Sequence, residues 1–481
     1  MSARQGNVAA LLAASAVYVA VAALAAPAGA QDLLRKGAPQ LRPVVLKNAI
    51  LHTIDRGTIV GGTLWFDGGV IRGVHAAGEE PQLPSGSDPL VVDAAQRHVF
   101  PGMIAACSQL GLVEIGMVRQ TVDTDELGDL SPEALAAVAV NPDSAAIPVA
   151  RSAGVLAAGV FPAGGLVPGR ASVIQLDGWT TADMTVRRDA GPIVSWPARP
   201  EGPRRGMRGG RRGTPPGAPP GTPPGAPPGE AAPAGDPEQA VKDQRKAIDE
   251  AFRRARAWLD SAKADPTTAP DLRCQALLPA LRGETPVFVL ADELEQIESA
   301  LAWARDLGLH AVLVGGRDAA LCADLLAHDR VPVIVTGVHR LPRRDDSDYD
   351  QPFALPGLLA KLGVRFCIAT GESFAHERNL PFHAATAAAF GLDREAALRA
   401  ITQDAAEILG VGDRLGTLTV GKDATLFVAD GNPLDLPTHV ERAWIQGREV
   451  DLRNKQTELA RKYRAKYQDA AAAQPGKPPG K

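Results

Sequence analysis

The sequence contains few aromatic residues and carries little net charge. Phe, Trp and Tyr make up 4% of its 481 residues, and the formal net charge at pH 7 is -4. Nucleic-acid binding usually relies on a basic surface and on aromatic rings that stack against bases. The composition therefore argues against a nucleic-acid partner, and small or charged soluble partners fit it better.

Cysteine is also scarce. The four cysteines are Cys107, Cys274, Cys322 and Cys367. Their wide spacing differs from the dense cysteine pattern of small domains that are held together by disulfides. An oxidising compartment would permit one bridge, but we expect free thiols. Cys107 and Cys367 each lie in an apolar, strand-like segment, which favours packing of their side chains.

One long hydrophobic run is present, and it lies close to the N-terminus. Arg4 precedes the apolar run from Val8 to Leu24, and Ala28-Gly29-Ala30 follows it. This order is typical of a secretory signal peptide with a cleavage site of small residues. A membrane anchor is the alternative, but the run is short for a span of about 20 residues. We predict a signal peptide at residues 1–30, no stable membrane span after cleavage, and a periplasmic or secreted protein.

Short β-type runs occur near both ends of the chain. Between residues 44 and 92 they are separated by turn signals such as Asp67-Gly68-Gly69. The same pattern returns in residues 423–450, with a hairpin-type turn at Gln446-Gly447. We therefore predict one small β-sandwich domain that is assembled from residues 42–95 and 415–452.

Apolar runs alternate with helical segments between these two regions. Residues 287–291 precede a predicted helix at 294–307, and residues 310–316 precede another at 319–327. This alternation predicts an α/β protein whose parallel sheet is covered by helices. We predict that this sheet closes into a TIM-like (β/α)8 barrel over residues 96–414. The chain length fits one such barrel with a small attached domain.

Residues 201–236 form an insertion that is rich in Pro, Gly and Arg. Glycine recurs at every fourth residue from Gly213 to Gly229, whereas a collagen helix needs it at every third. We expect a disordered, solvated loop within the barrel domain. Its arginines resemble a nucleic-acid-binding segment, but the predicted export argues against that role. The charged segment from Pro237 to Ala264 is predicted to be helical, and residues 470–481 to form a disordered tail.

Three segments carry a resemblance to a known family. Pro101 to Leu112 reads PGMIAACSQLGL, a Pro-Gly lead-in to a barrel strand, and residues 397–435 run from a helix through a Gly turn into a strand. Together with residues 141–184, they are similar to the amidohydrolase superfamily, in particular to its exported imidazolonepropionase-like and dipeptidase-like branches. The resemblance spans most of residues 44–450 and implies the barrel and the attached β domain.

The resemblance also implies where metal ligands would lie. In this superfamily, His and carboxylate side chains hold one or two divalent metal ions that activate a water molecule. The corresponding positions here are Cys107 and Gln109 in the first strand, Leu290, Gly315, and Gly371 at the place of the catalytic Asp. Leu and Gly offer no donor atoms, and a thiol with a neutral amide does not make a hydrolytic zinc site. We therefore expect no metal and no other cofactor, unless an active enzyme binds zinc or another divalent metal by other means.

A replacement catalytic site is the alternative to complete loss. The polar side chains near the predicted barrel mouth are Cys107, Asp292, Glu372, His376 and His383. Asp292 lies two residues after Leu290 and would share its face of the strand. Cys107 and His376 could act as nucleophile and base, although a packed thiol and a solvent-facing histidine are the alternative. His383 begins an Ala-rich helix and is interpreted as a capping or core histidine, and the remaining histidines show no two-ligand spacing.

These observations favour a non-catalytic amidohydrolase-like protein, a pseudoenzyme. It would bind a small-molecule ligand or pair with a metal-bearing amidohydrolase paralogue, as part of a homo- or hetero-oligomer. The alternative is an active hydrolase that cleaves C–N bonds in non-peptide amides, cyclic amides or dipeptides through an unrecognised site. A third hypothesis, an envelope-interaction protein that acts through the insertion at residues 201–236, has the least support.

Overall fold

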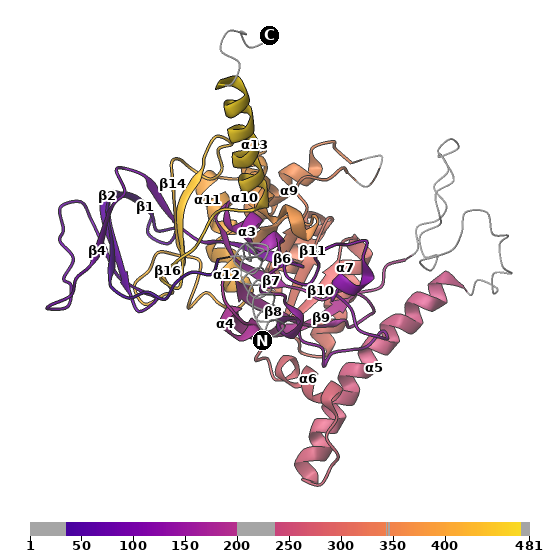
Figure 1. Ribbon diagram of the computed structural model, residues 1–481. Coiled ribbons are helices and arrows are strands. Elements are labelled where there is room, and N and C mark those ends of the chain that lie inside the picture. The colour runs from indigo at the N-terminus through magenta and orange to yellow at the C-terminus, as the bar shows by residue number, and fades with distance from the viewer. Residues whose placement is uncertain (1–34, 200–235, 343, 345–346, 473–481) are drawn as a thin grey trace, which may run out of the picture. The chain divides into compact units, whose positions relative to one another are not determined.

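The computed structural model describes residues 35–199, 236–342, 344 and 347–472 (Figure 1). The predicted signal peptide, nearly all of the predicted insertion and most of the predicted tail lie outside these residues. The described helices and strands belong to the unit from Gly37 to Lys481. Among the described helices, none combines the length and the apolar character needed to cross a bilayer.

Strands from both ends of the chain form one mixed sheet, as the sequence predicts. Its order is β16-β15-β14-β5-β1-β2-β3, and β4 pairs with β1. The strands are β1 (Val44–His52), β2 (Thr58–Asp67), β3 (Val70–His75), β4 (Leu90–Asp93), β5 (His98–Pro101), β14 (Leu426–Ala429), β15 (Val440–Ile445) and β16 (Arg448–Glu449). Figure 1 shows the yellow C-terminal strands beside the indigo N-terminal ones. Because β5 pairs with β1 and β14, the barrel begins after Pro101, slightly later than the predicted boundary at residue 96.

The two chain ends are joined by a shared apolar core. Phe66 from β2 and Trp444 from β15 are both buried, and their rings meet edge to face with centroids 5.8 Å apart. Gln446 and Gly447 connect β15 to β16 with φ values of 48° and 72°. Positive φ at both central residues is what a two-residue hairpin turn of the I′ type requires. The predicted hairpin is confirmed.

A second sheet of eight strands forms a nearly closed barrel, in the order β13-β12-β11-β10-β9-β8-β7-β6. The strands are β6 (Met103–Ser108), β7 (Val155–Val160), β8 (Gly169–Gln175), β9 (Thr185–Ser195), β10 (Val287–Ala291), β11 (Ala311–Gly315), β12 (Val333–Thr336) and β13 (Phe366–Ala369). The last strand, β13, packs beside the first, β6. The run from β9 to β13 is parallel, as predicted.

One strand departs from the parallel pattern. β8 runs antiparallel to both β7 and β9. The chain leaves β7 at Val160 and enters β8 at Gly169, and it leaves β8 at Gln175 and enters β9 at Thr185. A parallel crossover needs about a dozen residues or more, so these short connections produce antiparallel neighbours. The barrel is therefore TIM-like without a regular helix after every strand.

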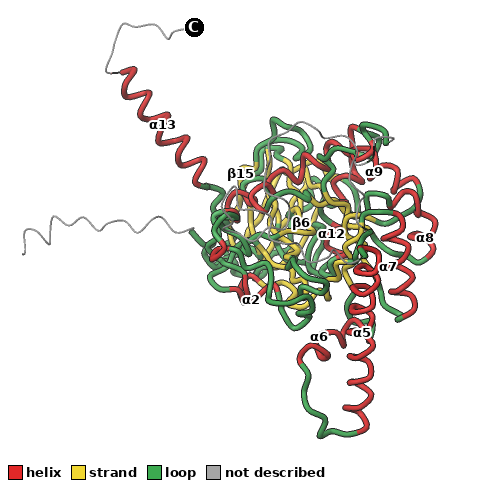
Figure 2. The backbone as a smooth tube through the Cα atoms, turned by 90° about the vertical axis from the view of Figure 1, so that its right-hand side faces the viewer, coloured by secondary structure: helices red, strands yellow, loops and turns green. Residues whose placement is uncertain are grey.

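Helices surround the parallel half of the barrel, and Figure 2 shows α7, α8 and α9 outside the central strands. The α-helices are α2 (Ala136–Ala139), α3 (Ala146–Arg151), α4 (Thr181–Met184), α5 (Pro237–Ala264), α6 (Leu272–Leu281), α7 (Leu294–Asp306), α8 (Ala323–His328), α9 (Gln351–Lys361), α10 (Leu380–Ala389), α11 (Arg394–Ala400), α12 (Gln403–Ile408) and α13 (Lys455–Ala472). Three short 3-10 helices are η1 (Arg119–Thr121), η2 (Ala319–Cys322) and η3 (Phe374–Asn379). The helix predicted from Pro237 to Ala264 is confirmed, with the Asp236 carboxylate capping its first turn through Glu238 N at 3.0 Å.

Candidate functional site

The positions that the resemblance assigns to metal ligands lie at or near the carboxyl ends of barrel strands, where barrel proteins usually bind ligands. Cys107 is in β6, Leu290 is in β10, and Gly315 is the last residue of β11. Gln109 follows β6 directly, and Gly371 follows β13 after one further residue. Only the thiol and the amide among them carry donor atoms.

The two glycines have backbone conformations that disfavour any other residue. Gly315 has φ of 105° and Gly371 has φ of 61°, both in the left-handed region. A Cβ atom at Gly371 would lie 2.6 Å from Gly337 N, and one at Gly315 would lie 2.6 Å from Asp292 Oδ1. An Asp at position 371 or a His at position 315 would require the surrounding chain to move.

The structure does not bring Cys107 and His376 together as nucleophile and base. His376 is exposed on η3, and its Nδ1 lies 3.2 Å from Glu372 Oε2. Burial and the nearby charge of Glu377 raise the pKa of the Cys107 thiol to about 12. A reactive cysteine needs the opposite shift, and the Cys107 side chain packs against the apolar core, so the structure gives the predicted pair no support. All four cysteines are free, as predicted.

The sequence analysis missed Glu377, a carboxyl group that is 1% exposed. Thr370, just after β13, donates its hydroxyl to Glu377 Oε2 at 3.0 Å. Burial raises the pKa of Glu377 to about 7, although hydrogen bonds from Ser108 and Thr370 oppose the shift. In the sequence, Glu377 belongs to a short polar segment that reads as a surface loop, so no pattern signals its burial. A buried carboxyl with such a pKa could take up or release a proton near neutral pH.

Asp292, a weak catalytic candidate in the sequence, takes part in an ion pair. Its Oδ2 lies 3.2 Å from Arg317 Nε, and its Oδ1 accepts a hydrogen bond from Arg317 N at 3.3 Å. The contacts join the loop after β10 to the loop after β11. Asp292 therefore positions Arg317 and is not left free to act as a base.

A cavity of about 270 Å³ opens at the carboxyl ends of β10, β11 and β12. It is lined by Glu293, Leu294, Glu295, Arg317, Asp318, Arg340, Leu341, Arg344, Ser347, Gln351 and Pro352. Arg344 Nη1 lies 3.1 Å from Asp318 Oδ2. The lining combines three guanidinium groups with an apolar wall, a composition suited to a small charged molecule.

Arg340 is the guanidinium group in this cavity that differs from the others. It is half-buried, and its Nη1 donates to the Thr336 carbonyl at 3.1 Å. Within the described part of the chain, no carboxylate lies within ion-pair distance of it. Burial and the positive charge of Arg317 lower the pKa of Arg340 to about 10. An anion placed beside Arg340 would offset both effects.

Two histidines that the sequence analysis treated as unrelated lie against each other. The rings of His339, in the loop after β12, and His383, in α10, stack with centroids 4.0 Å apart. His383 Nε2 lies 2.9 Å from Glu372 Oε1. Burial and His339 lower the pKa of His383 to about 4. The interpretation of His383 as a core histidine is confirmed by its complete burial. Its contact with His339 joins two different segments, so no spacing along one helix or strand signals it.

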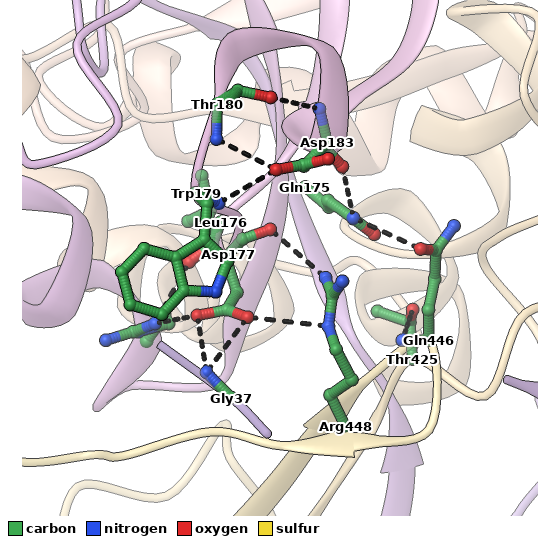
Figure 3. Close-up of polar contacts among 11 residues, drawn as sticks. Gly37, Gln175, Leu176, Asp177, Trp179, Thr180, Asp183, Thr425, Gln446 and Arg448 are labelled. Atoms are coloured by element: carbon green, nitrogen blue, oxygen red, sulfur yellow. Dashed lines mark hydrogen bonds and ion pairs between the residues drawn. The ribbon is translucent and has the colours of Figure 1, made fainter. Parts of the chain in front are cut away.

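The segment around Asp177 joins three parts of the fold (Figure 3). Asp177 Oδ1 lies 2.9 Å from Arg151 Nη1, and both residues are 2% exposed. Gly37 N donates to both carboxylate oxygens at 3.2 Å, and Arg448 Nη2 donates to the Asp177 carbonyl at 3.3 Å. Burial lowers the pKa of Arg151, while Asp177 raises it. Asp177 thus links α3, the end of β8 and β16, which is a structural role.

Comparisons with known proteins agree with this architecture. A family model described as "Amidohydrolase family" matches residues 387–451. The chain is 23% identical over 432 residues to "Amidohydrolase tasK" from Hapsidospora irregularis, and the match covers 84% of this chain. It covers 43% of that relative, so the chain spans less than half of the relative's length.

Solved structures show the same fold. An amidohydrolase from Thermotoga maritima MSB8 superposes with a TM-score of 0.69 at 24% identity, covering 85% of this chain and 100% of the other. A prolidase complexed with N-methylphosphonate-L-proline gives a TM-score of 0.50 at 17% identity, covering 85% and 99% of the two chains. The fold defines an α/β-barrel protein with a mixed β-sheet built from both chain ends. In sequence and fold, the chain is similar to members of the amidohydrolase superfamily.

Proposed function

We propose that this protein is a ligand-binding member of the superfamily that does not carry out metal-dependent hydrolysis at the centre of the barrel. The observation that supports this proposal most directly is the identity of the residues at the positions assigned to the family's metal ligands. Gly315 and Gly371 offer no donors and have left-handed backbones, and Leu290 offers no donor either. A catalytic zinc ion needs about three protein ligands and a bound water, so Cys107 and Gln109 alone do not fit the family's metal.

The cavity beside Arg317 and Arg340 supports a small ligand with a carboxylate group. Arg presents a planar fork of N–H donors that pairs with a carboxylate through two hydrogen bonds. Arg340 has no carboxylate partner among the described residues, whereas Arg317 and Arg344 pair with aspartates. A ligand carboxylate would therefore meet Arg340 without first displacing an ion pair.

Calorimetric titration with N-acetyl amino acids and dipeptides tests this proposal, with the matching C-terminal amides as controls. We expect the carboxylates to bind more tightly than the amides. Arg340→Gln should weaken carboxylate binding roughly tenfold or more, which corresponds to about 1.4 kcal/mol. Arg365→Gln is the matched control, because Arg365 is a half-exposed arginine that pairs with Glu407 on another face. Equal binding of acids and amides, or no effect of Arg340→Gln, would contradict the proposal.

The alternative, an active hydrolase of C–N bonds, is favoured by one observation. Glu377 is a buried carboxyl with a pKa of about 7, close to Cys107 at the end of β6. If the protein hydrolyses dipeptides, lactams or cyclic imides, Glu377→Gln should abolish turnover, since the amide cannot transfer a proton. Cys107→Ala and Asp292→Asn should leave that turnover intact. The Cys107 thiol is packed, and the Asp292 carboxylate is paired with Arg317.

We also propose export to the periplasm or cell exterior, and a metal-bearing paralogue remains a candidate partner. The support for export is the order of Arg4, the apolar run from Val8 to Leu24 and the small residues that end at Ala30. Mass spectrometry of the protein recovered from its native cells checks the cleavage. We expect a mature chain that begins at Gln31. Recovery of the chain with its first 30 residues attached would contradict the signal-peptide assignment.

A further inference from the structure

A second group of side chains with metal-binding chemistry lies apart from the family's ligand positions. His339, Glu372 and His383 each offer one ligand atom, and these atoms all lie within 4.8 Å of one another. They come from the loop after β12, the segment after β13 and helix α10. Two imidazoles and one carboxylate are a common ligand set of zinc.

The three ligand atoms would need to move only a short distance to surround a zinc ion. Tetrahedral zinc with bonds of about 2.0–2.1 Å places its ligand atoms roughly 3.4 Å apart. His383 Nε2 and Glu372 Oε1 are already 2.9 Å apart. The third ligand residue, His339, is exposed, and its ligand atom lies within 4.8 Å of the other two, so a change in its side-chain rotamer would bring it closer.

The group also has supporting hydrogen bonds of the kind that orient metal ligands. His339 Nε2 lies 2.7 Å from Thr386 Oγ1, and Asn379 Nδ2 donates to Glu372 Oε2 at 3.1 Å. Such contacts fix the ring tautomer and the carboxylate orientation. In addition, His383 is completely buried and its Nδ1 has no hydrogen-bond partner among the described residues. A buried polar nitrogen without a partner is costly, so this histidine is not explained by packing alone.

We infer that His339, Glu372 and His383 form a zinc-binding site at the edge of the barrel mouth. The three protein ligands leave one coordination position open to water or to a ligand group, because zinc prefers four. The exposure of His339 gives the ion a path from solvent. This inference does not rest on the proposed ligand-binding function, because Arg340 and the cavity around it contribute none of the three ligands.

The site is tested on the untagged full-length chain by removing metal with a chelator and dialysing against Zn²⁺. We expect about one zinc ion per chain by mass spectrometry of the metal, and a Co²⁺-loaded sample should show the visible absorption of a tetrahedral site. His339→Ala and Glu372→Gln should each weaken zinc binding by more than about 100-fold, since loss of a ligand exceeds the effect of losing an outer hydrogen bond.

Control variants separate loss of the site from loss of folding. His439→Ala removes an exposed histidine that pairs with Asp430 and should leave zinc binding unchanged. Because His339 is exposed, His339→Ala should keep the thermal unfolding temperature of the metal-free wild-type chain. If the wild-type chain retains no zinc, or if His339→Ala and Glu372→Gln bind zinc as tightly as it does, the inference is overturned.

Discussion

At the scale of residues, Glu377 is the group whose protonation most depends on the fold. Its carboxyl is buried between Ser108 at the end of β6 and Thr370 after β13, and its pKa is raised to about 7. A carboxyl with a raised pKa binds a proton more readily in the folded than in the unfolded chain. The stability that it contributes is therefore complete below its unfolded pKa and is lost as the pH rises toward 7.

Glu377→Gln should remove this pH dependence. Between about pH 4.5 and pH 7 the free energy of unfolding of the wild-type chain should fall by up to roughly 3 kcal/mol through this group. The variant keeps a neutral hydrogen-bonding side chain and should lack that fall, so it should be more stable than the wild type at pH 8. Urea unfolding of both proteins at pH 5 and pH 8 measures the difference. If the variant and the wild type differ in stability by the same amount at pH 5 and at pH 8, Glu377 does not titrate in this range.

The candidate site was only partly predictable from single residues. The residues at the family's ligand positions could be found because local motifs around β6 and β13 fix the alignment. His339 and His383 could not be paired, because their contact depends on how the loop after β12 meets α10. The contact of His376 with Glu372 could not be predicted either, because it depends on how the segment after β13 folds back on itself.

At the scale of elements, the strand ends of the barrel are shaped by glycines with left-handed backbones. Gly371 follows β13 and packs directly against the backbone of Gly337 after β12. Its position thus reflects the close approach of two loops. Any larger side chain at position 371 would meet the backbone of Gly337.

A pair of alanine substitutions separates backbone strain from steric contact. Gly371→Ala and Gly363→Ala both place a Cβ on a residue with positive φ, and each should cost about 1–2 kcal/mol for that reason. Gly363 has no neighbouring atom within 4 Å of the added Cβ, whereas Gly371 has Gly337 N at 2.6 Å. Gly371→Ala should therefore destabilise the protein by about a further 1 kcal/mol or more. If both variants lose the same unfolding free energy in urea, the loop after β12 moves to accommodate the added Cβ at no cost.

The elements themselves were largely predictable, with one exception. Apolar runs of strand length followed by amphipathic segments gave β10, α7 and β11 close to their observed bounds. The reversed direction of β8 was not predicted, because a strand pattern shows its period and not its direction. The short connections on either side of β8 were visible, and they were the available signal.

At the scale of the whole molecule, one link between the barrel and the mixed sheet runs through Asp177. Asp177 and Arg151 are almost fully enclosed, and Arg448 from the mixed sheet donates to the Asp177 carbonyl. Removal of one partner of a buried pair leaves the other charge without compensation. The prediction that both chain ends build one β domain is confirmed, and Asp177 connects that domain to the barrel.

Asp177→Asn should destabilise the chain by about 3–5 kcal/mol, because the Arg151 guanidinium would remain buried without its counterion. Glu449→Gln is the matched control, since the ion pair between Arg442 and Glu449 is largely exposed. That variant should cost about 1 kcal/mol or less. Thermal unfolding of both variants compares them. A loss for Asp177→Asn no larger than that of the control would contradict a role in joining the two domains.

For the whole molecule, we propose that the barrel fold is retained without hydrolysis at the centre of the barrel. The most direct test is a measurement of product formation by the zinc-loaded full-length chain with dipeptides, lactams and cyclic imides. We predict no hydrolysis above the buffer rate, even at ligand concentrations that saturate the cavity beside Arg340. Steady turnover of any of these compounds, abolished by Glu377→Gln, would contradict the claim.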